Sequence, residues 1–269
     1  MNDVPHWNTQ DRLMAIRPRA SEQKEFDKQW ASYWLEVQQV GPLTNTRYRL
    51  LLAELPRGLP AAPRILDVGC GPGIFLHRLS IRYPDAVLQG VEYSATAMEA
   101  ASPAVRPRIV HGDILDVAGE LGCEQFDLIV CSEVLEHVPD PMAVLRALAN
   151  LAAPGAILLL SVPAGMRHWS SQDDAAGHLR RFELAEFRAM LMQAGFEVAR
   201  LYTWGGPMSW LYNRTINACG PARAAHTSRS RVGRLAARLA TVALRIDDLW
   251  VGNRGFQMIA RARKPAAPR

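Results

Sequence analysis

Long apolar runs are missing from the 269-residue sequence, and cysteines are few. The longest apolar run, residues 156–162, is far shorter than the roughly 18 residues that a membrane-spanning helix needs. The first residues have no basic region followed by an apolar stretch, so no secretory signal is predicted. None of the four cysteines forms a C-x-x-C pair, which argues against a cysteine-based metal site and favours a reducing compartment. We therefore expect a cytoplasmic protein.

Acidic residues are absent from the stretch 223–245, which nevertheless contains six arginines: Arg223, Arg229, Arg231, Arg234, Arg238 and Arg245. The whole chain carries a formal net charge of +5, and the rest of it is close to neutral, so the excess belongs to this segment. No aromatic residue alternates with these arginines, which disfavours nucleic acid as a partner. A peripheral membrane contact through residues 230–250 stays open.

Strand-like apolar runs and helical patterns alternate between residues 64 and 163, in a chain with 49% hydrophobic residues. This alternation predicts an α/β fold with a doubly wound, mostly parallel sheet and helices on both of its faces. A further helix is predicted at 183–194, closed by Gly195, and further strands at 196–201 and 255–262. The core is expected over residues 59–204 and 255–264, with a frayed tail at 265–269.

An N-terminal helical cap is predicted over residues 1–58. Aromatic residues spaced along one helix face form a stripe, and Pro42 separates this helix from a second one at 44–55. We interpret the stripe mainly as packing, and a role as a lid over a ligand stays open. Its members include Phe26, Trp30, Tyr33 and Trp34.

A helical insertion is predicted over residues 205–254, between the last two strands. Apolar residues from Val232 to Leu249 recur there at helical spacing, which indicates an amphipathic helix over 230–250. We expect this helix to bury its apolar stripe against its own domain. There it would act as a lid across the entrance through which a substrate, the acceptor of the reaction, reaches its site.

The most informative stretch runs from Arg64 to Phe75, where a short apolar strand enters a glycine-rich turn that opens a helix. Glycine allows positive φ and has no Cβ, so a ligand can pack directly on this main chain. The spacing is G-x-G-x-G, whereas a dinucleotide site has G-x-G-x-x-G, and Asp67 precedes the turn. That carboxylate would repel a pyrophosphate and attract an ammonium group, which fits S-adenosylmethionine.

Two further acids follow predicted strands. Glu92 lies 23 residues after Gly69 at the end of an apolar run, where nucleoside-binding β-α-β units place a ribose-binding carboxylate. Asp113 belongs to a Gly-Asp pair, which is equally typical of ordinary turn chemistry.

Asp-Val-Gly-Cys-Gly-Pro-Gly at residues 67–73 resembles the first motif of the class I S-adenosylmethionine-dependent methyltransferases, and further matches follow in that family's order up to residue 163. The resemblance implies a seven-stranded, Rossmann-like methyltransferase fold with S-adenosylmethionine as cofactor. It places the glycine turn around the methionine part, the acid of the second strand on the ribose and the acid after the third strand on the adenine. The cofactor-binding residues that it implies are Asp67, Gly69, Cys70, Gly71, Glu92, Tyr93, Asp113, Ile114, Ser132 and Glu133.

Glu133, Glu136 and His137 follow the fourth predicted strand at a spacing that places them on one face of a helical turn. A similar Glu-x-x-Glu-His occurs in small-RNA 2′-O-methyltransferases and in the ubiquinone-biosynthesis O-methyltransferases, whose motif style this chain resembles, and there it supports divalent metal binding. Many relatives carry the stretch without a metal. We predict no metal here, because the sequence shows no further imidazole nearby to complete a metal shell. Glu133 and His137 would instead shape the floor beneath cofactor and acceptor.

His178-x-x-Arg181 lies in the loop after the fifth predicted strand, and related small-molecule methyltransferases often carry a similar pattern. A neutral imidazole can take a proton from a hydroxyl group, and a guanidinium can hold an anionic acceptor. We therefore predict His178, Arg181 and His137 as catalytic residues, with the first two lining the acceptor pocket. A solvated capping cluster is the alternative.

These observations predict a methyltransferase that acts on a hydroxyl or carboxylate oxygen of a small molecule. Transfer from a sulfonium is an in-line displacement that mainly needs alignment and exclusion of water. N- or C-methylation stays open, because the acceptor pocket is the least predictable part of such a fold. The alternative from another functional class is a binding protein, associated with a membrane surface or with nucleic acid through the basic segment 223–245.

Overall fold

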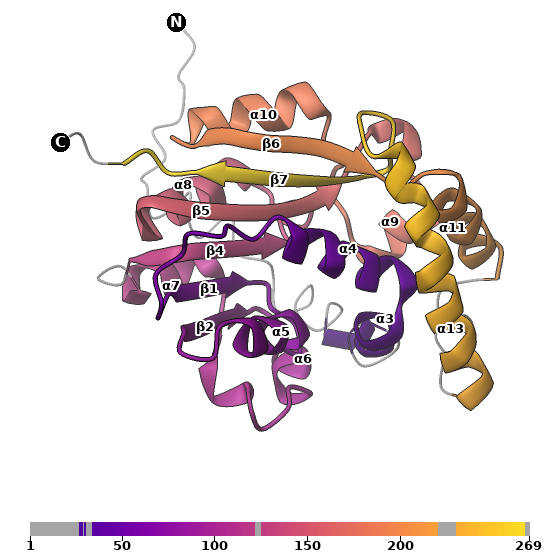
Figure 1. The fold of residues 1–269 in the computed structure, drawn as a ribbon, viewed down its shortest axis with the longest axis horizontal. Helices are drawn as coiled ribbons and strands as arrows, with labels where there is room; N and C mark the ends of the chain where they lie inside the picture. Colours follow the sequence, from indigo (N-terminus) through magenta and orange to yellow (C-terminus); the bar gives the residue numbers. More distant parts are fainter. Residues whose placement is uncertain (1–26, 29, 31–33, 122–124, 220–229, 267–269) are drawn as a thin grey trace, which may run out of the picture.

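The computed structural model describes residues 27–28, 30, 34–121, 125–219 and 230–266. At its centre lies a seven-stranded sheet with the order β3-β2-β1-β4-β5-β7-β6 (Figure 1). Strands β1 to β5 pair in parallel, whereas β7 is antiparallel to both β5 and β6. The predicted doubly wound, mostly parallel α/β fold is confirmed. The strands are β1 (Arg64–Val68), β2 (Val87–Glu92), β3 (Ile109–His111), β4 (Phe126–Ser132), β5 (Ala152–Pro163), β6 (Glu197–Trp204) and β7 (Gln257–Arg263).

Helices cover both faces of the sheet, each over its own hydrophobic cluster. Successive residues of a strand point to opposite faces, so Leu66 of β1 belongs to one cluster and Ile65 to the other. A sheet covered on both faces needs strands that are apolar almost throughout, and β1 is buried from its second residue onward. One face carries α7 (Ile114–Leu121), α8 (Pro141–Leu151) and α10 (Leu184–Gln193); the other carries α4 (Pro42–Ala53) and α5 (Ile74–Arg82).

The N-terminal cap contributes α3 (Leu35–Val40) and α4 to the described chain. Helix α4 begins at Pro42 itself, two residues before the predicted start at Thr44. Proline suits the first helical position, because the N–H that it lacks has no partner inside the helix there. Of the predicted aromatic stripe, Phe26 and Tyr33 lie outside the described residues.

The segment between β6 and β7 is helical, as predicted, but its long helix is divided. It contains α11 (Pro207–Cys219), α13 (Arg231–Ala243) and the 3₁₀ helix η4 (Leu244–Trp250). The buried carboxylate of Asp247 accepts hydrogen bonds from the backbone N–H groups of Met208 (3.0 Å) and Ser209 (2.6 Å), which ties η4 to the start of α11.

The expectation that this segment buries its apolar stripe is wrong. Helix α13 packs beside α3 and α4 at the right-hand end of the molecule (Figure 1), but Val232, Leu235, Leu239 and Val242 are exposed. The opposite face, with Gly233 and small residues at 237, 240 and 241, is the less exposed one. Small side chains let the helix approach its neighbours, so the larger apolar residues are turned outward. In the described part of the chain, no helix combines the length and the apolar character needed to cross a bilayer.

Candidate functional site

The glycine turn joins β1 to α5 at the carboxyl end of the sheet. Gly69, Gly71 and Gly73 have φ angles of 66°, 55° and 71°, in the left-handed region that favours glycine. A Cβ at Gly69 would lie 2.3 Å from Val134 Cγ2. The N–H of Gly69 donates to the Val91 carbonyl at 2.8 Å, which holds the turn against β2. The predicted strand–turn–helix is therefore confirmed.

Two carboxylates are buried at this end of the sheet, Asp67 in β1 and Glu92 in the neighbouring β2. Glu92 accepts hydrogen bonds from the N–H groups of Gly71 (2.6 Å) and Ser94 (2.7 Å), whereas Asp67 Oδ2 has no hydrogen-bond partner among the described residues. Burial, together with the charge of Glu92, raises the pKa of Asp67 to about 8, and burial raises the pKa of Glu92 to about 7. A buried carboxylate is costly without a partner, so this arrangement fits a ligand that carries an ammonium group.

The N-terminal segment lies over the glycine turn. A Cβ at Gly71 would lie 2.8 Å from Trp30 Cη2, and Ser94 Oγ donates a 2.5 Å hydrogen bond to Asp27. Trp30 is buried, and its ring centroid is 6.4 Å from that of Trp34. One member of the predicted aromatic stripe thus contacts the turn, which favours the lid interpretation over packing alone.

Asp113 and Ile114 lie where β3 leads into α7. Asp113 Oδ1 accepts a 2.8 Å hydrogen bond from the Leu115 N–H and so caps the helix, and Ile114 is buried in the core. Tyr93 is half-buried, with its carbonyl 3.1 Å from His111 Nε2. The capping role is the turn chemistry that the Gly-Asp pair indicated, and a contact of Asp113 with adenine stays a prediction.

Glu133 directly follows β4 and is the one non-glycine residue of the described chain with a positive φ, 57°. Such strain often marks a functional position. Its carboxylate accepts a 2.9 Å hydrogen bond from Ser161 Oγ and pairs with Arg47 of α4 at 3.3 Å. Ser161 Oγ also lies 2.8 Å from Ser132 Oγ. Sequence reasoning missed Arg47 and Ser161, because no motif marks either residue.

Glu136, His137 and His178 form a cluster in which candidate ligand atoms lie within 4.8 Å of one another. Residues 135–137 form a single hydrogen-bonded turn, not a helix, and Glu133 faces Arg47 and Ser161 outside the cluster. Both carboxylate oxygens of Glu136 are buried without a hydrogen-bond partner among the described residues. Burial and the charge of Glu133 raise the pKa of Glu136 well above its ordinary value, and burial and nearby His178 lower the pKa of His137 to about 3.

The loop 164–182 brings His178 to this cluster. The Leu179 N–H donates to the Glu136 carbonyl at 2.8 Å, which joins the loop to the turn after β4. His178 Nδ1 lies 2.7 Å from the carboxylate of Asp173, which stands in the first turn of α9 (Ser171–Ala176). We assign the proton to Nδ1, since a carboxylate can only accept; this leaves Nε2, 3.9 Å from Glu136 Oε1, as the acceptor.

Arg181 has a different role from the one predicted. Its Nε and Nη2 donate to Asp173 at 2.8 and 3.0 Å, and Nη1 donates to the carbonyls of Ala164 (3.3 Å) and Phe256 (3.1 Å). This corrects the expectation that the Arg181 guanidinium lines a pocket. The group is buried and instead ties the loop 164–182 to the end of β5 and to the start of β7. Burial opposes ionisation of Asp173, but hydrogen bonds from His178 and Arg181 outweigh it and hold its pKa below the ordinary value. Sequence reasoning missed Asp173, although the Ser-x-x-Asp capping pattern at 170–173 marks a helix start.

The cluster has the donor set of a divalent-cation site, with two imidazoles and one carboxylate. His178 is the further imidazole that the sequence did not reveal, so the reason given for excluding a metal is wrong. A ligating histidine usually donates its second N–H to a carboxylate, as His178 does to Asp173. The residues fit a cation, and the absence of a metal stays a prediction.

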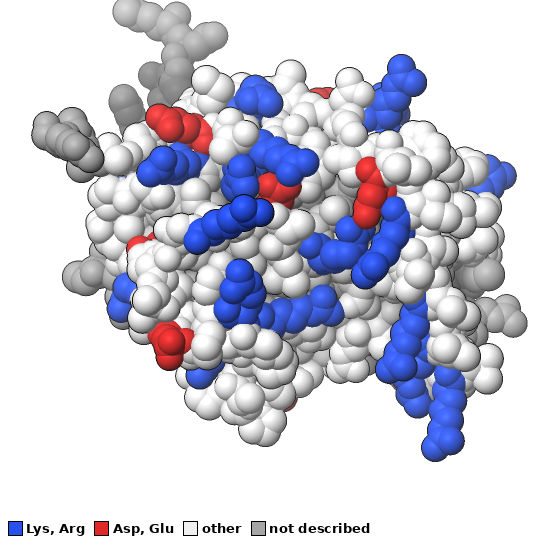
Figure 2. Space-filling model, viewed as in Figure 1, with Lys and Arg blue, Asp and Glu red and all other residues white. Residues whose placement is uncertain are grey.

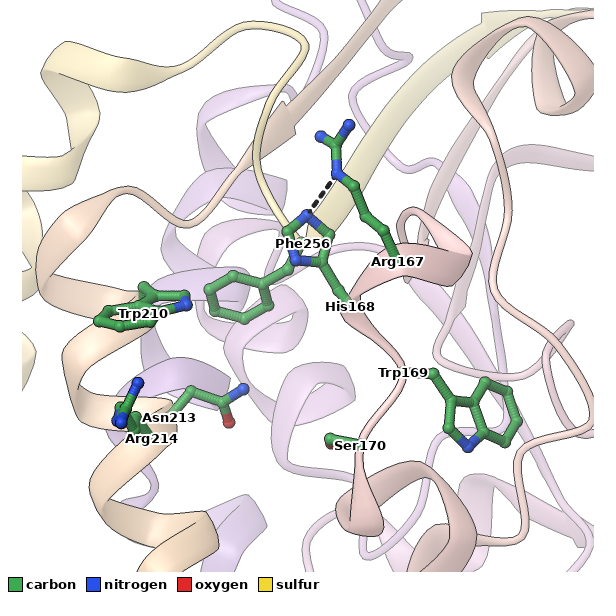
Figure 3. A pocket seen from close by; sticks show the side chains of 8 residues that line it. All are labelled: Arg167, His168, Trp169, Ser170, Trp210, Asn213, Arg214 and Phe256. Atoms are coloured by element: carbon green, nitrogen blue, oxygen red, sulfur yellow. Dashed lines mark hydrogen bonds between the residues drawn. The ribbon is translucent and has the colours of Figure 1, made fainter.

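A surface hollow of about 260 Å³ lies between residues 167–170 and helix α11 (Figure 3). Arg167 Nε donates to His168 Nε2 at 3.1 Å, and burial together with Arg167 lowers the pKa of His168. Neither His178 nor Arg181 belongs to its lining. The lining residues are Arg167, His168, Trp169, Ser170, Trp210, Asn213, Arg214 and Phe256.

Comparison with known proteins shows the family. Residues 41–201 match the model of a methyltransferase domain. The ubiquinone biosynthesis O-methyltransferase of Neisseria meningitidis serogroup C is 30% identical over 158 residues, and that of Hahella chejuensis is 33% identical over 146 residues. These alignments cover 51% and 52% of this chain and 64% and 60% of the relatives, so the chain spans less than two thirds of either relative's length.

Solved structures show the same fold at low identity. The N-methyltransferase NodS from Bradyrhizobium japonicum, in complex with S-adenosyl-L-homocysteine, is 17% identical with a TM-score of 0.57, covering 90% of this chain and 98% of NodS. The [4+2]-cyclase SpnF is 17% identical with a TM-score of 0.61, covering 94% and 98%. Neighbours with such different reactions show the fold alone. Through the domain match, the chain belongs to the methyltransferase-domain family.

Proposed function

We propose that this methyltransferase transfers a methyl group to a hydroxyl oxygen of a small molecule, with His178 as general base. The observation that carries the proposal is the 2.7 Å contact between His178 and Asp173, which orients the imidazole and leaves Nε2 to accept a proton. A hydroxyl group must lose its proton as its oxygen attacks, so a hydroxyl acceptor needs such a base. The names of the ubiquinone biosynthesis O-methyltransferases support the choice of oxygen.

The glycine-turn residues would bind the cofactor, which supplies an electrophilic methyl group on its sulfonium. The unpartnered oxygen of Asp67 suits the ammonium group of the methionine part. Glu92 and Tyr93 would contact the ribose, and Asp113 and Ile114 the adenine. Gly69, Cys70 and Gly71 would pack against the ligand by their backbone.

The hollow beside α11, which His178 does not line, would hold an anionic aromatic part of the acceptor, and the reacting hydroxyl would extend from it toward His178. The hollow beside α11 offers the guanidinium groups of Arg167 and Arg214 and the indoles of Trp169 and Trp210. Guanidinium groups bind carboxylates and phenolates, and indoles stack on aromatic rings. Glu133, which contacts Arg47 and Ser161, would form part of the floor beneath cofactor and acceptor.

A divalent cation is a second means of removing the hydroxyl proton. The two orphaned oxygens of Glu136 beside His137 and His178 favour this alternative. A bound cation would lower the pKa of the acceptor hydroxyl, and His178 would then act as a ligand. Chelation followed by titration with magnesium or manganese, read by calorimetry and by turnover, separates the two means.

The test of the proposed function is a panel of phenols, catechols, carboxylates and amines, with S-adenosylhomocysteine formation as readout. We expect turnover with hydroxylated aromatic acceptors. Turnover with amines alone would overturn the oxygen assignment. Retention of activity after exhaustive chelation would exclude the cation and leave His178 as the base.

A further inference from the structure

Helix α13 presents two unlike faces, and the larger apolar residues lie on the outer one. At about 100° per residue, positions 233, 237, 240 and 241 share one side of the helix, and positions 232, 235, 239 and 242 share the opposite side. The first set is partly covered, in line with packing against α3 and α4. The second set is Val232, Leu235, Leu239 and Val242, with exposed fractions of 77%, 57%, 62% and 61%.

The apolar face continues beyond α13. Ile246, Leu249 and Trp250 of η4 are exposed by 50%, 81% and 52%. So many large apolar side chains exposed along two consecutive helices indicate an interaction site. The surface is also held in place, since Arg49 of α4 donates to both oxygens of Asp248 at 2.9 and 2.7 Å.

Arginines line one flank of this apolar face. On the same helical projection, Arg231, Arg234 and Arg238 fall together between the outer and the packed side. Helix α13 contains no acidic residue. Figure 2 shows basic side chains gathered over the lower part of α13, with no acidic side chain among them on this face.

From this arrangement we propose that α13 and η4 dock the enzyme on an anionic phospholipid surface. The helix lies parallel to the bilayer, its apolar face enters the boundary between headgroups and acyl chains, and its arginines contact lipid phosphates. A second copy of the chain is the poorer partner, because α13 offers no carboxylate to pair with the arginines of another α13. Helix α11, which packs on η4, also lines the acceptor hollow, so docking brings that hollow close to the membrane.

The test is co-sedimentation of the full chain with vesicles, at physiological salt. Vesicles of phosphatidylcholine with phosphatidylglycerol are compared with vesicles of phosphatidylcholine alone. We expect binding to the anionic vesicles only. The double variant Arg231→Glu, Arg238→Glu should bind the anionic vesicles at least about tenfold more weakly, because each arginine near the surface contributes to the attraction for anionic lipid. The double variant Leu235→Ser, Leu239→Ser should weaken vesicle binding to a similar extent.

Matched controls lie on the other face of the sheet. Arg146→Glu with Arg188→Glu makes the same change of net charge on α8 and α10, where both arginines are exposed, and should bind as the wild type does. Unchanged thermal unfolding of each variant shows that folding is intact. Absence of wild-type binding, or equal loss in the control, overturns the proposal. Dimerisation in light scattering that disappears in the Leu235→Ser, Leu239→Ser variant overturns it in favour of a second copy.

Discussion

One short stretch, residues 67–73, forms most of the glycine-turn end of the candidate site, whereas the histidine end draws on several separate elements. The glycine turn needs only β1, the start of α5 and one acid from the adjacent strand. The histidine end combines the turn after β4, α9 and the loop that follows it. The first end is set by local backbone preference, and the second depends on loops docking correctly.

The two ends of the candidate site also differ in which of their buried carboxylates have hydrogen-bond partners. At the glycine turn, Asp67 and Glu92 are buried acids with raised pKa values, and Asp67 Oδ2 has no hydrogen-bond partner among the described residues. At the histidine end, Asp173 contacts His178 and Arg181 at hydrogen-bond distance, whereas neither carboxylate oxygen of Glu136 has a hydrogen-bond partner in the described part of the chain. Each end therefore has one acid that a ligand or a proton must satisfy.

The largest expected effect is at the glycine turn. Gly69→Ala should weaken S-adenosylmethionine binding by about 10²-fold or more, because the residue has positive φ and its Cβ would clash with Val134. Calorimetry measures the affinity. Gly119→Ala in α7, where a Cβ meets nothing within 4 Å, is the control and should bind normally. Normal binding by Gly69→Ala would show that cofactor binding does not depend on the left-handed conformation of this turn.

The matching change at the histidine end should affect turnover alone. His178→Ala should reduce turnover by roughly 10²-fold, as expected on removing a general base, with cofactor affinity intact. His77→Ala, an exposed histidine on α5, serves as the control. Near-normal turnover would show that His178 is not the base and that catalysis rests on the alignment of the acceptor with the methyl group alone.

Glu92→Ala tests whether the second strand holds the ribose. Loss of charge-assisted hydrogen bonds should weaken cofactor binding by roughly ten- to a hundred-fold. The exposed acid Glu120 gives the control variant Glu120→Ala. Unchanged affinity in calorimetry would refute the assignment and leave Glu92 as a support for the backbone of Gly71 and Ser94.

The smallest effect is the pH dependence of cofactor binding. Raised pKa values of about 8 for Asp67 and about 7 for Glu92 mean that both acids are protonated at low pH and ionise as pH rises through this window. Affinity for a cationic cofactor should therefore increase from pH 6 to pH 8 by about tenfold, the equivalent of one pKa unit of interaction. Asp67→Asn should flatten the profile. A profile that falls over this range would contradict the assignment of Asp67 to the ammonium group.

The comparison of prediction with structure follows the same division. The glycine turn, the alternation of strands and helices and the acid at the end of β2 were predictable, because glycine spacing and apolar periodicity are local properties of the chain. Arg47 and Ser161 were not, since they reach Glu133 from distant elements. Arg181 was assigned to the acceptor from its spacing to His178, and only the fold showed that Asp173 holds it.

By itself the sequence determined a doubly wound α/β fold and the conformation of its glycine turn, since both follow from periodicity and from residues next to one another. The tertiary structure decided which side chains meet His178 and which way α13 faces. The apolar period of α13 is the same whether its stripe is buried or exposed. Only the docking of its small-residue side near α4 turned Leu235 and Leu239 outward.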